Sequence, residues 1–149
     1  RTAWVFSEYG NNFLKTMLRL GAERDELSIV GDQVGCPTYA QDIAVAVVSI
    51  ISQLNSLEDI DGIYHFCGDS ACSWFEFAKE IFDYINKYNH ISIPIIKAVT
   101  TEEYPTLAER PKFSVLDNKK IQETFDIFSS DWKVGVESVL KKVVKGSCI

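Results

Sequence analysis

Apolar positions recur along this chain with two different spacings, and these spacings predict its elements. From Phe13 onward, apolar residues return every three or four positions, which indicates a helix over about 12–24. Runs rich in β-branched and aromatic residues at 1–7 and 27–30 indicate strands instead. Strands and helices alternate in this way along the chain, and the alternation predicts an α/β fold.

The remaining elements follow from the same patterns. Residues 40–55 are predicted as a helix whose apolar positions nearly encircle it, which indicates burial between layers. Ser73 and Glu76 have the spacing of a capping box, in which each side chain bonds the other's backbone, so a helix begins there and runs to about Asn89. Further predicted elements are a strand at 62–67, a strand at 91–99 that Pro94 moves to an edge or splits, and helices at 117–125 and 131–145.

Two stretches have no periodicity. Residues 31–38 contain two glycines and a proline and are predicted to form a loop. Residues 100–114 contain two prolines and are long for a connection without a role, so functional groups are expected there. No linker or repeat divides the sequence, and residues 1–149 are therefore predicted to form one domain.

Composition and charge exclude several classes of partner. The chain has 149 residues, of which 46% are hydrophobic and 24% charged, as in ordinary globular proteins. Acidic residues outnumber basic ones by 21 to 15, which argues against a nucleic-acid partner. No apolar run approaches the roughly 20 residues that cross a bilayer, so no membrane partner is expected. The chain begins directly in a predicted strand, without a methionine or leader, which suggests a fragment.

The four cysteines indicate reduced thiols in a cytoplasmic protein. Cys36, Cys67, Cys72 and Cys148 form no Cys-x-x-Cys pair, and a chain of this length needs no disulfides. A zinc site built from His65, Cys67 and Cys72 lacks a fourth ligand, so no metal is predicted.

The sequence lacks the motifs of dinucleotide binding and hydride transfer. No strand is followed by the closely spaced glycines that bring a backbone against a pyrophosphate. Tyr84 is followed four positions later by Tyr88 instead of the lysine of a Tyr-x-x-x-Lys pair. We therefore predict no catalytic residue in this chain and expect it to bind no cofactor by itself.

Four runs follow one another along the chain: RT-x-WV from Arg1, DQ-x-G-x-PT from Asp32, EYPT-x-x-x-RP from Glu103 and S-x-LD from Ser114. Together they resemble the dTDP-4-dehydrorhamnose reductase family of extended short-chain dehydrogenase/reductases. The resemblance covers nearly the whole chain, yet it corresponds only to the C-terminal, substrate-binding half of the family's Rossmann-like fold. The dinucleotide-binding half, with the Tyr-x-x-x-Lys pair, would have to precede it.

The resemblance implies a function and leaves alternatives. The family uses NADPH or NADH to reduce dTDP-4-dehydro-L-rhamnose to dTDP-L-rhamnose, a precursor of surface polysaccharide. This chain would then bind the dTDP-sugar and be inactive alone. Without the missing half, apolar surface would be exposed and would favour a homo-oligomer. The alternatives are a non-catalytic binding subunit, similar to the regulatory subunit of methionine adenosyltransferase, and another nucleotide-sugar reductase or epimerase.

The resemblance also implies the site residues. The substrate would be bound by Trp4, Asn12, Gln33, Pro37, Thr38, Tyr104 and Arg110, and Thr2 and Ala3 would lie beside the nicotinamide.

Residue chemistry agrees with these roles. The Trp4 indole suits the apolar face of a deoxysugar, and the Arg110 guanidinium suits a diphosphate. Gln33 and Thr38 offer donors to phosphate or base, and Tyr104 would stack on or close over the ligand.

Structural roles remain open for each of these residues. Asn12 equally fits a helix cap, Trp4 core packing and Arg110 a surface ion pair. Trp74 and Trp132 are interpreted as packing residues. The central hypothesis is that Trp4, the 33–38 loop and Arg110 face one cleft.

Overall fold

The computed structural model of the chain describes residues 1–89, 93–106 and 108–146, and it confirms the predicted α/β class. The helices are α1 (Phe13–Glu23), α2 (Ala40–Gln53), α3 (Trp74–Asn89), α4 (Lys119–Phe125) and α5 (Trp132–Gly146). The strands are β1 (Val5–Phe6), β2 (Glu26–Val30), β3 (Val34–Gly35), β4 (Thr38–Tyr39), β5 (Cys72–Ser73) and β6 (Ile95–Val99). They form the parallel pairs β1–β4 and β2–β6 and the antiparallel pair β3–β5.

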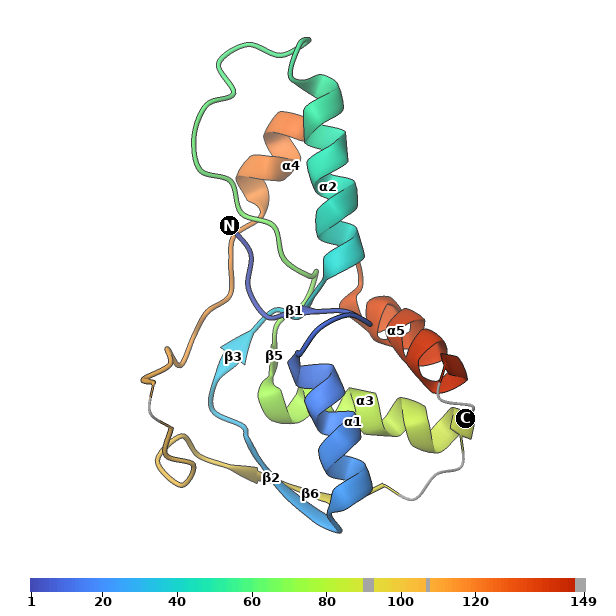
Figure 1. Cartoon of the computed structure of the whole chain (residues 1–149). Coiled ribbons are helices and arrows are strands. Elements are labelled where there is room, and N and C mark those ends of the chain that lie inside the picture. Colours follow the sequence, from blue (N-terminus) through green and yellow to red (C-terminus); the bar gives the residue numbers. More distant parts are fainter. Residues whose placement is uncertain (90–92, 107, 147–149) are drawn as a thin grey trace.

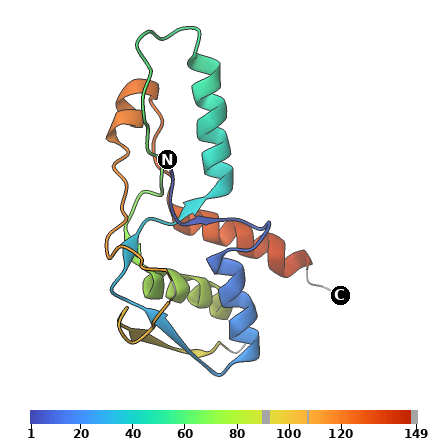
Figure 2. The ribbon, with the colours of Figure 1, turned by 60° about the vertical axis from the view of Figure 1, so that its left-hand side comes forward.

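The chain folds into a body and a projecting lobe, which both ribbon views show (Figures 1 and 2). The body contains α1, α3, α5 and the β2–β6 pair around a large hydrophobic cluster that includes Phe6, Phe77 and Leu140. The lobe contains α2 and α4 around a smaller cluster of Ala46, Phe66, Ile121, Phe125 and Ile127. The β1–β4 pair lies where the lobe meets the body.

Side-chain caps place the starts of two helices where the sequence predicts them. Asn12 accepts a hydrogen bond from the backbone N–H of Lys15 at 3.1 Å and thereby caps α1. Its amide nitrogen donates to the carbonyl of Ser7 at 2.8 Å. The capping box that begins α3 is confirmed: Glu76 accepts from the backbone N–H of Ser73 at 2.7 Å, and the Ser73 hydroxyl accepts from the N–H of Glu76 at 3.1 Å.

Two predicted strands are wrong in extent. The strand predicted at 1–7 is reduced to β1, and the one predicted at 62–67 forms no ladder. Their backbones do meet, because the Arg1 amino group donates to the Tyr64 carbonyl and the Arg1 carbonyl accepts from the Phe66 N–H. Alternation alone cannot reveal that this pairing stops after one residue.

Other boundaries differ for local reasons. The predicted loop at 31–38 contains β3 and the first residue of β4, and both strands are too short to show an alternating pattern. The predicted strand at 91–99 begins as β6 directly after Pro94, because proline has no N–H to donate to a ladder. Residues 91 and 92 of that prediction lie outside the described residues.

The predicted burial of α2 is also wrong. Val45, Val48 and Ile51 are 62%, 66% and 60% exposed, and Ala46 is the buried residue of this helix. α2 contacts α4 and β4 along one side. Its remaining sides carry an apolar surface that the described part of the chain does not cover.

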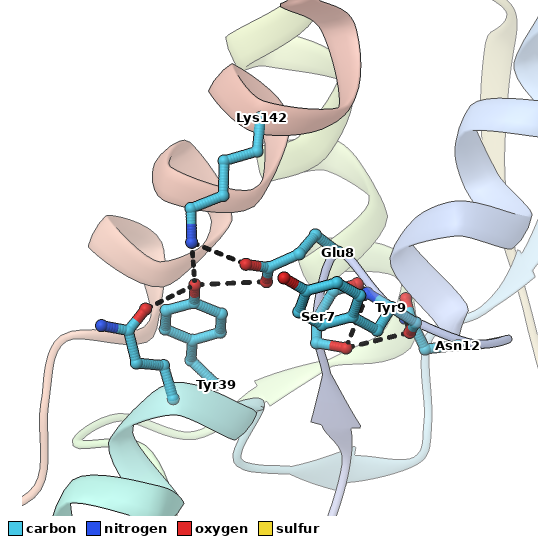
Figure 3. A network of polar contacts seen from close by, with 7 residues as sticks. Ser7, Glu8, Tyr9, Asn12, Tyr39 and Lys142 are labelled. Carbon is cyan, nitrogen blue, oxygen red and sulfur yellow. Dashed lines mark hydrogen bonds and ion pairs between the residues drawn. The ribbon is translucent and has the colours of Figure 1, made fainter. Parts of the chain in front are cut away.

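A polar network joins the turn after β1 to β4 and α5 (Figure 3). The Lys142 ammonium donates to Glu8 at 2.6 Å and to the Tyr39 hydroxyl at 3.0 Å. The Tyr39 hydroxyl lies 3.0 Å from the amide oxygen of Gln41 and 3.3 Å from Glu8. The bond from Lys142 holds the pKa of Glu8 below its ordinary value. This network fixes the end of the segment that carries Trp4.

We expect Glu8→Gln to lower the melting temperature by about 2–4 °C at neutral pH, the effect of roughly 1 kcal/mol in a domain of this size. Because the folded-state pKa of Glu8 is depressed, its stabilisation is complete above about pH 4.5 and is lost as the pH falls further. Thermal unfolding of both proteins between pH 3 and pH 7 checks this. A gap between the two melting temperatures that persists unchanged in acid would contradict it.

Candidate functional site

A cavity of about 530 Å³ lies between α1, β2, the start of α3 and the segment 104–110. This volume is typical of a small-ligand pocket. Apolar side chains from α1 and aromatic rings line it together with a few polar groups. The lining residues are Phe13, Met17, Leu20, Arg24, Glu26, Leu27, Ser28, Ile29, Val30, Gln33, Trp74, Tyr104, Thr106 and Arg110. Three residues of the predicted site, Gln33, Tyr104 and Arg110, therefore line one cavity.

Side-chain bonds at the end of β2 bring the distant 104–110 segment to the cavity. Thr101 donates to the Asp32 carboxylate from its backbone N–H at 2.9 Å and from its hydroxyl at 2.7 Å. The hydroxyl bond is the main reason that the pKa of Asp32 lies below its usual value. Gln33, which is buried, donates to the Thr101 hydroxyl at 3.1 Å. These bonds fix the start of the segment that carries Tyr104 and Arg110.

Two arginines give this cavity a positive character. Arg24 and Arg110 line it, and neither guanidinium forms a hydrogen bond or ion pair within the described part of the chain. Three carboxylates lie within two positions of Arg24 in sequence, and none pairs with it: Glu23 pairs with Arg19 at 3.0 Å, Glu26 pairs with Lys97 at 2.7 Å, and Asp25 forms no ion pair within the described residues. Two unpaired guanidiniums suit a ligand with two negative charges, such as a diphosphate.

Trp4 adjoins the cavity through Trp74. The two indoles stack with ring centroids 3.5 Å apart and an interplanar angle of 9°. The Trp4 backbone has φ = 52°, in the left-handed region that bulky residues avoid. Gly35 packs closely against the indole, since a Cβ there would come within 2.4 Å of Trp4 Cε2. Backbone strain of this kind clusters at functional sites.

The other predicted site residues lie away from the cavity lining. Pro37 and Thr38 are fully buried, and the Thr38 hydroxyl donates to the Ala3 carbonyl at 2.8 Å. The Thr38 N–H donates to the Trp4 carbonyl at 3.1 Å. Thr38 therefore supports the Ala3–Trp4 backbone from a buried position, next to the buried Pro37. Asn12 is likewise occupied, because both ends of its amide bond the backbone around α1.

Several cavity residues were not predicted from the sequence. Arg24, Ser28, Thr106 and Trp74 line the cavity, together with apolar residues of α1 and β2. Trp74 does pack, as interpreted, but it also forms part of the cavity wall. Alternation along β2 could have placed Ser28 on the same face as Glu26. No local signal shows that Arg24 lacks a carboxylate partner.

Buried thiols in the body are not suited to nucleophilic chemistry. Cys36, Cys67 and Cys72 are free and buried, while Cys148 lies outside the described residues. Burial raises the pKa of Cys36 and of Cys72 to about 12, so both remain thiols at neutral pH. In the described ranges no cluster of three His, Cys, Asp or Glu side chains could hold a metal ion. None of the helices described has the length and apolarity that crossing a membrane requires.

Known proteins share this architecture over nearly the whole chain. The family model for the RmlD substrate binding domain matches residues 1–145. A dTDP-4-dehydrorhamnose reductase of Aggregatibacter actinomycetemcomitans is 47% identical over 93% of this chain and 48% of its own length. The corresponding enzyme of Escherichia coli K12 is 37% identical over the full chain and 50% of its own length.

Solved structures agree with these sequence relatives. A dTDP-4-dehydrorhamnose reductase of Clostridium acetobutylicum has a TM-score of 0.83 at 38% identity, over 97% of this chain and 48% of that one. The Bacillus anthracis enzyme in complex with NADP has a TM-score of 0.80 at 38% identity, over 95% and 47%. The chain thus spans about half the length of the relatives that it matches, with the fold of the C-terminal half of an extended short-chain dehydrogenase/reductase. It belongs to the RmlD substrate-binding domain family.

Proposed function

We propose that this chain is the substrate-binding part of a dTDP-4-dehydrorhamnose reductase and that it binds the dTDP-sugar in the 530 Å³ cavity. The observation that carries this proposal is the arrangement of Arg24 and Arg110, two unpaired guanidiniums in one aromatic-lined cavity. The relatives that share this domain are named for a dTDP-sugar substrate. A diphosphate supplies the two negative charges that such a cavity favours.

The roles of the individual residues follow from their positions. Arg110 anchors the diphosphate, Gln33 offers its amide at the end of β2, and Tyr104, 48% exposed, closes over the ligand. Trp4 presents its indole to the apolar face of the sugar. Pro37, Thr38 and Asn12 act indirectly, by fixing the backbone on which these groups stand. Together these residues orient the sugar so that C4 faces the site of reduction.

The reduction itself would depend on residues outside this chain. A bound NADPH or NADH would supply the hydride for C4, and a tyrosine outside this chain would supply the proton for the oxygen. The described residues contain no glycine-rich turn that would cradle a dinucleotide. Thr2 and Ala3 directly precede Trp4 in the chain. They would lie beside the nicotinamide, next to the sugar that Trp4 contacts. We expect the isolated chain to show no NADPH consumption with dTDP-4-dehydro-L-rhamnose, and sustained turnover by the pure chain would refute this.

The apolar surface of α2 supports a contact with a dinucleotide-binding half. Val45, Val48 and Ile51 are exposed and form an apolar surface on α2. Exposed apolar surfaces of this kind are normally covered by another part of a protein or by a partner. The relatives are about twice as long as this chain. We therefore propose that α2 packs against that half, which would account for its nearly all-round apolar sequence.

Calorimetric titration of the purified chain tests the proposed substrate class. We expect dTDP-L-rhamnose and dTDP to bind with dissociation constants in the micromolar range, and UDP-glucose and GDP-mannose to bind at least about tenfold more weakly. Equal affinity for all three nucleotides would favour another nucleotide-sugar enzyme. The lack of any nucleotide binding, with retention of a protein partner in a pull-down, would favour a non-catalytic binding subunit.

Arg24→Gln is expected to weaken dTDP binding by about three- to tenfold, because it removes one of the two unpaired charges of the cavity. Arg19→Gln is the matched control. It makes the same change in the same helix, but Arg19 already pairs with Glu23 and does not line the cavity. Equal affinities of the two variants would contradict a role for Arg24.

A further inference from the structure

We propose that Trp74 is a positioning residue, which holds the Trp4 indole in place for the sugar of the bound nucleotide. This inference rests on the proposed function and adds a residue to the same site. It follows from three features of the indole pair: the strain at Trp4, the rigid mounting of Trp74, and the place of Trp74 in the cavity wall.

Trp4 needs external support to keep its conformation. Its backbone lies in the left-handed region at φ = 52°, which is unfavourable for a bulky side chain. It stands in an irregular segment before the two-residue strand β1, so little regular pairing holds it. The Thr38 N–H binds its carbonyl, but that bond does not by itself orient the indole, which packs against Gly35. The parallel stack on Trp74, at 3.5 Å, fixes the orientation of the indole.

Trp74 has the support that Trp4 lacks. It is the first residue of α3, directly after the capping-box serine, so its backbone is fixed by the Ser73–Glu76 bonds. Its ring packs against Phe13 of α1 with centroids 4.6 Å apart. It also faces Phe77, which is completely buried, with centroids 6.4 Å apart. Trp74 is therefore a fixed platform, and Trp4 is the side chain that the platform orients.

Trp74 lies between the positions proposed for the two ends of a sugar nucleotide. Its ring forms part of the wall of the cavity that contains Gln33 and Arg110, and its face carries the Trp4 indole. A nucleotide in the cavity and a sugar beside Trp4 would thus contact the two members of one stacked pair. Loss of Trp74 should harm sugar recognition more than nucleotide recognition, because the cavity keeps its arginines while Trp4 loses its orientation.

The test compares dTDP with dTDP-L-rhamnose in calorimetric titrations of Trp74→Leu, Trp74→Phe and wild type. The decisive quantity is the affinity gained from the sugar. It is the dissociation constant of dTDP divided by that of dTDP-L-rhamnose. We expect Trp74→Leu to reduce this ratio by about five- to tenfold, as the loss of an aromatic pair implies. Trp74→Phe should restore part of it, because a smaller ring still supports the indole.

The control variant is Phe128→Leu, an exposed aromatic side chain outside the cavity, which should keep the wild-type ratio. A wild-type ratio in folded Trp74→Leu would overturn the positioning role and leave the proposed function intact. If the wild-type chain binds neither ligand, the proposed function itself fails. Far-ultraviolet circular dichroism and thermal unfolding establish that each variant is folded.

Discussion

Arg110→Gln should weaken the binding of dTDP and dTDP-L-rhamnose by about 10–100-fold, the loss expected when a bidentate, charge-assisted contact to a phosphate is removed. Arg110 lines the cavity and has no ion pair or hydrogen bond within the described part of the chain, so the substitution breaks no polar contact there. The melting temperature should therefore stay close to that of wild type. Calorimetric titration and thermal unfolding measure the two effects separately.

Lys112→Gln is the matched control for this experiment. It removes a positive charge from the same segment, two residues away, but Lys112 does not line the cavity. Its effect on affinity should be below about twofold at physiological salt, where exposed charges are screened. Equal losses in both variants would show that only the overall charge matters. Unchanged binding in Arg110→Gln would remove the main support for a diphosphate site.

Gly35→Ala is expected to destabilise the chain by about 1–3 kcal/mol and to displace the Trp4 indole. A Cβ at this position would lie 2.4 Å from Trp4 Cε2 and 2.8 Å from the Ser114 hydroxyl oxygen, closer than real atoms pack. Because β3 pairs with β5, the backbone of Gly35 cannot retreat freely. The Trp4 ring must move instead and break its stack on Trp74.

The stacked indoles give this prediction a direct readout. Two parallel indoles in contact couple their electronic transitions, so the wild type should show an indole couplet by circular dichroism that Gly35→Ala loses. Gly31→Ala is the control, since its added Cβ would meet Ala98 Cβ at 3.3 Å, a contact that small shifts relieve. Retention of the couplet and of full dTDP-L-rhamnose affinity in Gly35→Ala would show that the close approach of Trp4 is unimportant.

Much of the helical framework could be predicted from the sequence, because its signals are local. Asn12 and the Ser73–Glu76 pair cap their helices through contacts within a few residues, and a pattern of that length is visible in a sequence. Strands depend on partners far away. The segment 62–67 has an alternating pattern, but among the described residues its backbone pairs with the main chain only at Arg1, and no local signal shows that the pairing stops there.

The candidate site was predictable only where residue chemistry is distinctive. Arg110 and Gln33 stand out as potential ligand-binding groups, but their meeting depends on the β2–β6 pairing and on the Asp32–Thr101 bonds, which join residues 69 positions apart. The helix cap before Trp74 predicts only a packing role for this residue. Its second role appears only when the Trp4 ring is seen against it.

The separation of the body from the α2–α4 lobe has a consequence for how the chain unfolds. The lobe has its own small apolar cluster and meets the body at the two-residue pair β1–β4. Hydrogen exchange should therefore be faster in α2 and α4 than in α3, through openings that leave the body intact. A two-state analysis of unfolding would then misstate the free energy of unfolding, because the lobe and the body would not unfold together. A partner that covers α2 would couple the lobe to the body and make unfolding cooperative again.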